Sequence, residues 1–506
     1  MNKLGSGIIN DIKGRLKFYR SDYTDGMHYK SLSSSIFLFF ACLAPAVTFG
    51  GILGTYTDGA MGVVEMIVAS ALCGVAFAIF SGQPLTILGG TGPMLVITAM
   101  LYQLSNRLNL DFLSVYFWVG MWTCVLTIVA AVTNLSNIMK YFTRFTDEIF
   151  AALISIIFIV EAVTSISKMF VGLEVTSNHS TALLTLLLAL GTYVIANGIT
   201  RLRRTRFLNR FMREFLSDFG PIIAIGCMTL IALKFKEVNL DALPAPAEFG
   251  TTSGRAWTVE PWRIPIWARL ASIIPAFFVT ILVFLDQNIT VRLINAPEHK
   301  LKKGEAYHWD MLVVGVLIGI CSMFGLPWLV AATVRSLNHV RGLAQFKDIK
   351  NKEGKTENKL ISTRETRVSG LLIHLMLGGT LLVLPLIKQV PMAILYGLFL
   401  YMGVVSMKGN QFFERLSLWF MDPELYPEKH YTHKVPMKTI HKFTLIQLIG
   451  LITLWVVKVS PVGILFPLFI AILVPFRSLL KKFFTPDQLE FLDSEEEASE
   501  EEEHWS

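Results

Sequence analysis

Two Gly-x-Pro interruptions occur in apolar stretches of this sequence, and they constrain its fold more than any other feature. The first runs from Gly82 to Pro93 and the second from Gly325 to Arg335. Each continues into a short run that favours extended backbone and then a Thr at which a new helix can begin. An unpaired amide is costly in lipid, so irregular backbone at membrane depth survives only where protein covers it or where it lines a cavity. Paired breaks at corresponding positions of two halves therefore predict a transporter's binding site.

The composition places the rest of the sequence in a membrane. Of its 506 residues, 53% are hydrophobic and 16% are charged, whereas roughly 25% are charged in a soluble domain. Many apolar runs approach or exceed the length that spans a bilayer, and we expect about 14 such segments. The predicted fold class is an all-α polytopic membrane protein.

The basic residues cluster at one end of the predicted segments. If Met1 starts in the cytoplasm, the clusters follow the fourth, sixth, eighth, tenth and twelfth segments. They are Lys140 with Arg144, Arg201 to Arg213, Lys300 to Lys303, Lys347 to Lys355 and Lys408 to Lys438. This positive-inside pattern predicts a multi-pass protein of the plasma membrane with both termini in the cytoplasm. The formal charge of +7 then requires no nucleic-acid partner.

The two halves are expected to be inverted repeats. Seven segments per half is an odd number, so the second half enters the bilayer from the opposite side. Pro45 in segment one and Pro275 in segment eight occupy matching places, as do the breaks in segments three and ten. We therefore predict a 7+7 inverted repeat with two discontinuous half-helices.

The predicted units follow from this division. They are an N-terminal basic, interfacial segment at 1–30, a first repeat at 31–235, an extracellular loop at 236–264, a second repeat at 265–482 and an acidic cytoplasmic tail at 483–506. Within 1–30, Ile9, Ile12, Leu16 and Tyr19 share a face, which fits a helix on the inner leaflet or a disordered basic arm. Asn178 begins a glycosylation-type tripeptide, and the run from Glu495 to Glu503 is expected to be disordered.

Asp286 is the strongest candidate for chemistry inside the membrane. It lies deep in segment eight, and ionisable residues within spans are functional candidates. Thr290 is one helical turn further on, so its hydroxyl shares a face with the carboxylate. These oxygens suit a cation or a proton, and a sodium site at Asp286, Thr290 and Thr333 is one interpretation. A carboxylate paired with a neighbouring helix is the alternative.

Arg335 is the candidate for binding an anion. Its guanidinium remains charged and offers a planar fork of donors for an oxyanion. Helices that begin near Thr91 and Thr333 would aim free amides at the same point, which makes Gly92 and Val334 further candidates for the anion site. The alternative is that Arg335 reaches to an interface.

Four other charged residues are weaker candidates. Glu65 and Glu161 lie in segments two and five, and each could stand near a span end. Lys168 and Lys458 border outer span ends, where they could attract anions or simply anchor a helix.

With these residues the sequence resembles the bicarbonate transporter family, which includes anion exchangers and sodium bicarbonate cotransporters. The matching strings run in order along nearly the whole chain. They are 21–25, 45–51, 82–93, 144–148, 274–276, 286–287, 298–304, 326–336, 400–404 and 454–458. The resemblance implies a homodimer in which a core domain moves against a gate domain.

Two departures from the family pattern matter. Only about thirty residues precede segment one, whereas animal members have a large soluble domain there. The site itself also differs, because sodium-coupled members tend to have Asp at the position of Asp286 without Arg at that of Arg335, and chloride/bicarbonate exchangers pair Glu with Arg. This chain has Asp with Arg.

The charge balance favours chloride/bicarbonate exchange by alternating access. With Arg335 positive and Asp286 ionised the site is neutral, so a monoanion can bind without a cation beside it. Sodium-coupled bicarbonate or carbonate transport is the alternative, and borate or another oxyanion remains open. We expect no catalytic residue and no cofactor, since the sequence contains neither HExxH nor GxSxG.

Overall fold

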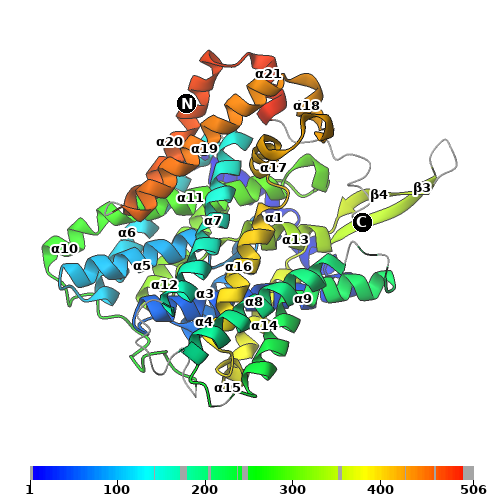
Figure 1. Ribbon diagram of the computed structural model, residues 1–506. Helices are drawn as coiled ribbons and strands as arrows, with labels where there is room; N and C mark the ends of the chain where they lie inside the picture. The colour runs from blue at the N-terminus through cyan, green and yellow to red at the C-terminus, as the bar shows by residue number, and fades with distance from the viewer. Residues whose placement is uncertain are drawn as a thin grey trace.

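The computed structural model describes residues 4–141, 143–170, 179–202, 205, 207–235, 237–241, 249–350, 356–427, 429–460 and 463–493. Helices form almost all of it, and a β-hairpin projects from one side (Figure 1). The glycosylation candidate Asn178 and the acidic run from Glu495 to Glu503 lie outside the described residues.

The first half of the chain contains one short strand among helices. Its elements are α1 (Ser6–Leu16), α2 (Tyr19–Thr24), α3 (Tyr29–Tyr56), α4 (Val63–Phe80), β1 (Leu88–Gly89), α5 (Gly92–Arg107), α6 (Phe112–Val132), α7 (Arg144–Lys168), α8 (His179–Arg201) and α9 (Arg210–Ala232).

The second half repeats this order at its start and then adds the hairpin. Its elements are α10 (Ile266–Ala271), α11 (Ile273–Ile294), α12 (His308–Met323), β2 (Val330–Ala331), α13 (Thr333–Gly342), β3 (Ala344–Lys350), β4 (Thr356–Thr363), α14 (Val368–Gly379), α15 (Leu384–Ile387), α16 (Met392–Met407), α17 (Gln411–Ser417), α18 (His430–Lys434), α19 (Met437–Val459), α20 (Phe466–Leu479) and α21 (Pro486–Asp493).

Within the described residues, seven helices are long and apolar enough to cross a membrane. The number is eight if Met392–Met407 and Gln411–Phe420, bent by 81° at their junction, form one span. Shorter apolar helices add to these, for example the 16-residue α12. The chain is therefore an integral multi-pass membrane protein. Its full-length spans are fewer than the segments expected, because the breaks leave short helices such as the 10-residue α13.

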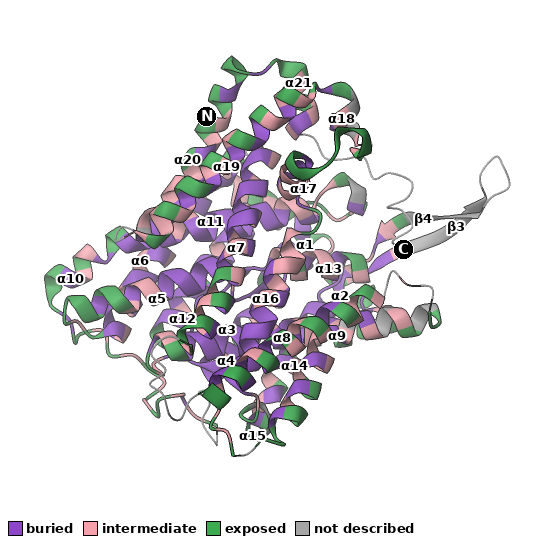
Figure 2. Ribbon diagram, in the orientation of Figure 1, coloured by how far each residue is buried: buried purple, intermediate pink, exposed green. Residues whose placement is uncertain are grey.

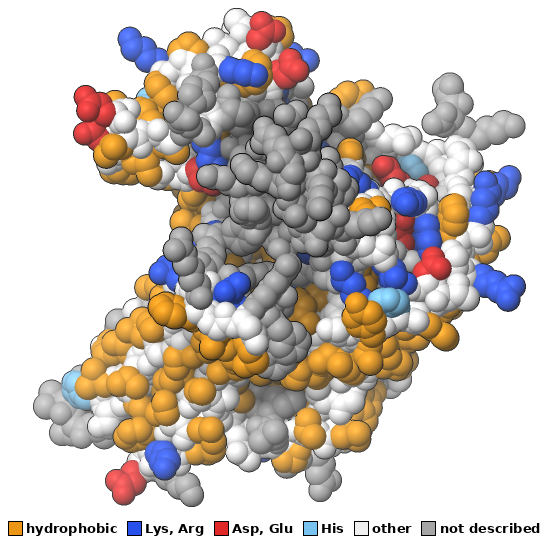
Figure 3. All heavy atoms as spheres, turned by 90° about the vertical axis from the view of Figure 1, so that its right-hand side faces the viewer, with side chains coloured by type: hydrophobic (Ala, Val, Ile, Leu, Met, Phe, Trp, Pro, Cys, Tyr) orange, Lys and Arg blue, Asp and Glu red, His pale blue; other side chains and the backbone are white. Residues whose placement is uncertain are grey.

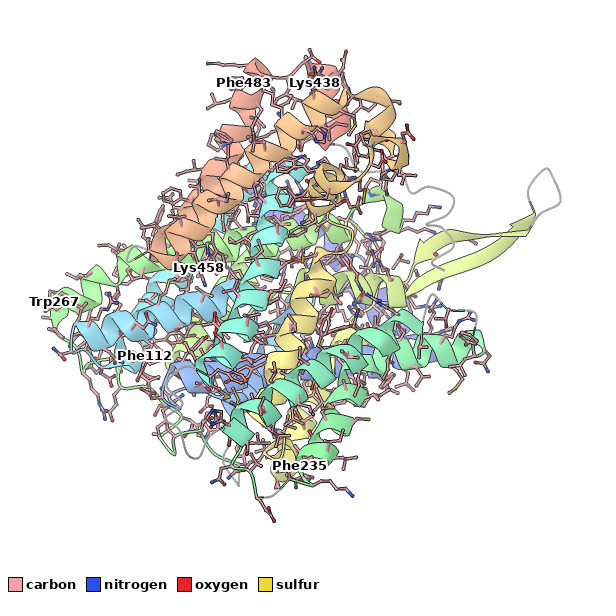
Figure 4. The ribbon with its side chains drawn as sticks, viewed as in Figure 1. Phe112, Phe235, Trp267, Lys438, Lys458 and Phe483 are labelled. Carbon is pink, nitrogen blue, oxygen red and sulfur yellow. The ribbon has the colours of Figure 1, made fainter. Side chains whose placement is uncertain are left out.

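The buried residues concentrate in the middle of the helix packing (Figure 2), for example on α3, α4, α11 and α16. Large apolar side chains also cover outward surfaces (Figure 3). Phe235, Trp267 and Phe483 are examples on the periphery (Figure 4). Exposed apolar surface of this extent suits a lipid environment.

The helix contacts divide into two groups. In the first body, α6 packs on α11 and α12, and α14 packs on α3 and α4. In the second body, α7 packs on α16 and α19, and α8 packs on α9 and α16. Fewer contacts join the bodies, chiefly between α3 and α9 and between α11 and α20.

The two predicted breaks lie side by side at the centre of the first body. The strands β1 and β2 pair in an antiparallel ladder, with Leu88 opposite Ala331 and Gly89 opposite Val330. The amide of Ala332 also donates to the Ile87 carbonyl, at 2.9 Å. Backbone groups of each break thus satisfy those of the other, which is how irregular chain is tolerated in a membrane protein's interior.

The N-terminal segment is helical and packs on the rest of the chain, so it is not a disordered arm. Residues 6–24 form α1 and α2, and Arg15 of α1 is buried, pairing with Asp22 at 3.1 Å and with Glu365 at 2.9 Å. Glu365 lies 350 positions along the chain from Arg15, so an isolated amphipathic pattern could not reveal this pairing. We call this end of the bundle, with α1, α2, the loop 297–307 and the hairpin, the hairpin face.

The C-terminal segment is also partly folded. Residues 486–493 form α21, and Asp493 accepts hydrogen bonds from the Phe145 amide (2.7 Å) and from Arg477 (2.5 Å). A carboxylate at the first turn of α7 is favourable because it meets unpaired amides and the positive end of the helix dipole.

Candidate functional site

Helix α11 connects the two broken helices through a pair of side chains one turn apart. The hydroxyl of Thr91 donates to the Asp286 carboxylate at 3.0 Å. The hydroxyls of Thr290 and Thr333 are hydrogen-bonded at 2.7 Å. Asp286 is 5% exposed and Thr290 is fully buried. The structure therefore brings together four of the predicted site residues around one stretch of α11.

Both half-helices begin where the Thr residues indicated. Thr91 is the N-cap of α5, and its hydroxyl makes no cap hydrogen bond because it donates to the Asp286 carboxylate instead. Thr333 is the first residue of α13, with Ala332 as N-cap. First-turn amides lack partners within a helix, so Gly92 and Thr333 each present a donor and a positive dipole end near α11.

Arg335 lies in the first turn of α13 and extends toward the other break. Its Nη2 donates to the Gly90 carbonyl at 2.6 Å. A Cβ placed on Gly89 would lie 2.2 Å from Nη1 of Arg335, so this guanidinium fits only against a glycine. Arg335 is held beside the start of α5 and does not reach away to an interface.

Val334 contributes differently from the other predicted residues. Its side chain is 60% exposed, so what it can offer an anion is the backbone amide of the first turn of α13.

Aromatic side chains of both bodies close the space around the α5 start. Phe49 of α3 packs against Phe158 of α7 and Phe399 of α16, with ring centroids 5.8 Å and 5.5 Å away. A Cβ on Gly92 would lie 2.8 Å from the Phe158 ring. The site thus lies at the seam between the bodies.

A cavity of about 10 Å³ adjoins Thr91 in this arrangement, which is room for about one water molecule. Its lining includes Phe49, Met66, Gly90, Thr91 and Trp328. This cavity is too small for an anion of several atoms, so binding one on that side of Thr91 needs the bodies to separate.

The first break is held by residues that sequence reasoning did not single out. Both carboxylate oxygens of the buried Asp310 accept backbone amides, from Gly82 at 2.5 Å and Gln83 at 3.0 Å. Ser336 accepts from the Ile87 amide at 2.9 Å. The signal was available for Asp310, since it is an ionisable residue in the first turn of an apolar segment.

The second break is held by the loop 249–265. Arg255 donates to the Gly325 carbonyl at 2.8 Å and to the Ala60 carbonyl at 3.2 Å. Gly325 has a φ of +59°, a conformation that favours glycine. Burial lowers the pKa of Arg255, with Glu65 opposing this effect. This end of the bundle, opposite the hairpin face, is called the loop face.

Glu65 has a structural role in this arrangement. It is fully buried and accepts hydrogen bonds from Gly62 (2.8 Å) and from the amide of Thr252 (2.7 Å), so it anchors the loop to the start of α4.

The other weaker candidates also lie away from Asp286. Glu161 is half-buried on α7, and Lys168 is exposed at the end of that helix. Lys458 lies in the last turn of α19, with its ammonium 4.9 Å from the Trp455 ring centre. Within the described part of the chain, none of these three side chains hydrogen-bonds to Asp286, Thr91, Thr290 or Thr333.

The donor set around Asp286 consists of oxygens. Among the described residues, no group of three or more His, Cys, Asp or Glu side chains is placed to hold a metal ion. One carboxylate with the hydroxyls of Thr91, Thr290 and Thr333 is a weaker set that suits a hard monovalent cation carried as cargo.

The sequence matches the family described as the HCO3- transporter integral membrane domain, over residues 3–181 and 169–497. The chain belongs to the bicarbonate transporter family. It is 35% identical over 559 residues to the sodium-driven chloride bicarbonate exchanger of Bos taurus, covering 97% of this chain and 50% of that protein. It is 36% identical over 560 residues to the electroneutral sodium bicarbonate exchanger 1 of Mus musculus, covering 97% of this chain and 51% of that protein.

Another relative carries a different name. The chain is 36% identical over 527 residues to anion exchange protein 3 of Mus musculus, covering 97% of this chain and 43% of that protein. The chain therefore spans about half the length of these bicarbonate transporter relatives.

Solved structures share the fold at low sequence identity. The transmembrane domain of the cyanobacterial bicarbonate transporter BicA aligns with a TM-score of 0.58 at 16% identity, covering 84% of this chain and 98% of that one. SLC26A9 aligns with a TM-score of 0.62 at 14% identity, covering 94% of this chain and 69% of that one. These likenesses concern the fold alone.

Proposed function

We propose that this protein is a secondary active transporter of bicarbonate and related inorganic anions, and that it works as a chloride/bicarbonate exchanger. The observation that carries this is the placement of Arg335, whose guanidinium lies against Gly90 beside the start of α5. Together with first-turn amides of α5 and α13 it supplies fixed positive charge and planar donors, the chemistry that an oxyanion requires.

The architecture supports alternating access. The order α3, α4, β1, α5 recurs as α11, α12, β2, α13, and the two strands pair in opposite directions. We interpret this as the 7+7 inverted repeat, with the first body as the core domain and the second as the gate domain. Since the site lies on the seam, relative movement of the bodies would expose it alternately to the two sides. The positive-inside pattern supports a hairpin face on the cytoplasmic side of the plasma membrane.

The charge balance supports exchange without a cation. Arg335 and Asp286 offset each other, so a chloride or a bicarbonate can occupy the site in turn. An exchanger of this kind returns its site only with a bound anion, which makes each flux dependent on the other.

Sodium-coupled bicarbonate or carbonate transport is the second candidate, with one observation in its favour. The Asp286 carboxylate and three Thr hydroxyls form an oxygen set next to the anion site. Two of the similar proteins have sodium in their names. Borate or another oxyanion would use the same donors.

Intracellular pH recovery in cells expressing the chain separates these candidates. For an exchanger we expect bicarbonate-dependent flux that stops when chloride is removed and continues without sodium. Flux that requires sodium and ignores chloride would contradict exchange and support the sodium-coupled candidate. Arg335→Ala, checked for normal surface amount, is the reference for a protein without the anion site.

The homodimer implied by the family resemblance remains a prediction. Light scattering of the detergent-solubilised protein measures it directly, and a monomeric mass would contradict it.

A further inference from the structure

An ion pair between Asp147 and Arg292 joins the two bodies. Asp147 lies in the first turn of α7, in the second body, and Arg292 in the last turn of α11, in the first body. Nη2 of Arg292 donates to Oδ2 of Asp147. The side chains are 30% and 15% exposed, respectively, so the pair is partly shielded from solvent. In Figure 1, α7 and α11 cross near the middle of the molecule.

The pair stands between the site and the hairpin face. Arg292 follows Thr290 by two residues and Asp286 by six, which is about 9 Å along a helix with a rise of 1.5 Å per residue. Beyond it α11 ends at Ile294, and the chain enters the loop that belongs to the hairpin face. A path from the site to that face along α11 therefore passes this contact.

Asp147 is fixed to the second body. The neighbouring Phe145 amide donates to Asp493 at 2.7 Å. Glu148, next in sequence, accepts hydrogen bonds from Arg415 and from Gln447 at 2.9 Å. The first turn of α7 is thus held from both sides by elements of its own body.

Arg292 is fixed to the first body. Its helix is bound to both broken helices, through Asp286 to Thr91 and through Thr290 to Thr333. Neither partner can follow the other when the bodies move apart, so separation at this end must break the ion pair.

We propose that Asp147 and Arg292 form a latch that holds the two bodies together on the hairpin-face side of the site and breaks when they separate there. This rests on the proposed function, because alternating access is what gives the latch its role. The latch adds residues that set the sidedness of access, apart from those that bind the transported ions.

Hydrogen–deuterium exchange of the full chain in lipid nanodiscs tests the latch without any transport measurement. Arg292→Gln and Asp147→Asn should each raise exchange about three- to fivefold in peptides covering 144–150 and 288–294, the effect of losing a partly exposed ion pair. Peptides of the loop 249–265 should not change. The matched control is Arg263→Gln, because Arg263 pairs with Glu260 at 2.7 Å in an exposed ion pair within the loop 249–265, and it should leave exchange in peptides 144–150 and 288–294 unchanged.

The charge-reversed double variant Asp147→Arg with Arg292→Asp decides the outcome. Exchange that returns toward the wild-type value supports a direct latch. Unchanged exchange in both single variants, an equal rise in the same peptides of Arg263→Gln, or a folded double variant that fails to restore protection would each overturn it. If the ion substitution experiment contradicts chloride/bicarbonate exchange, this test still stands, since it reads the opening of one face.

Discussion

At the scale of single residues, the site depends on how closely the two breaks approach. Arg335 and Gly90 belong to different breaks and are 245 positions apart in the sequence, yet a hydrogen bond joins them. The guanidinium occupies the space beside Gly89 in which a methyl group would stand. The absence of a side chain at Gly89 therefore allows the Arg335 guanidinium to take this position.

Gly89→Ala should reduce bicarbonate flux at least about tenfold, because the added Cβ displaces the guanidinium by more than the tolerance of a positioned charge. The measurement is pH recovery normalised to surface protein. Gly226→Ala in α9, where a Cβ meets nothing within 4 Å, should transport normally. Wild-type flux in Gly89→Ala would show that the position of Arg335 beside Gly90 is not required.

At the scale of elements, each break is held by one charged residue from elsewhere in the chain. Asp310 accepts the amides that follow α4, and Arg255 donates to the carbonyls that follow α12. The two breaks therefore differ, because an acidic residue holds the first and a basic residue holds the second. Arg335 likewise occurs on only one of the two half-helices. An inverted repeat can therefore preserve its backbone while its two halves diverge in chemistry.

Asp310→Asn should destabilise the protein by about 1–3 kcal/mol, since one of two buried amides loses its carboxylate acceptor. Thermal unfolding in detergent measures the loss. Asp111→Asn is the matched control, because Asp111 caps α6 by accepting from the Ser114 amide at 2.9 Å and Asn caps helices about as well. Equal unfolding temperatures for the wild type and Asp310→Asn would contradict this role.

At the scale of the whole molecule, a buried charge network joins the N-terminal helices to the second half. Asp22 pairs with Arg15, Lys303 and Arg367 at 3.0 to 3.1 Å. Glu365 accepts the second donor of Arg15. The network fastens α1 and α2 to the first body at the hairpin face.

Asp22→Asn should cost about 3–5 kcal/mol, because it leaves three cations around a neutral side chain in a buried place. The variant should unfold at a lower temperature, and limited proteolysis should cleave it faster at sites that follow α1 and α2. Asp25→Asn removes a carboxylate that is 47% exposed and pairs with the same Lys303, so we expect a loss of no more than about 1 kcal/mol. Similar stability of the two variants would exclude a special role for Asp22.

The sequence alone determined the features that are local along the chain. Proline, glycine and threonine in the breaks indicated where backbone pairing fails and where α5 and α13 begin, and Asp286 and Thr290 one turn apart predicted a shared face. Charge distribution and length indicated a multi-pass membrane protein. These inferences succeed because helix starts and helix faces depend on residues within a few positions of each other.

Only the tertiary structure decided which distant groups meet. It paired β1 with β2, placed Arg335 against Gly90, used Asp310 and Arg255 to hold the breaks, and brought Asp147 to Arg292. It also buried Arg15 of α1 and paired it with Glu365. Such contacts join residues that lie 70 to 350 positions apart, and their geometry depends on how whole helices pack, which no local sequence pattern specifies.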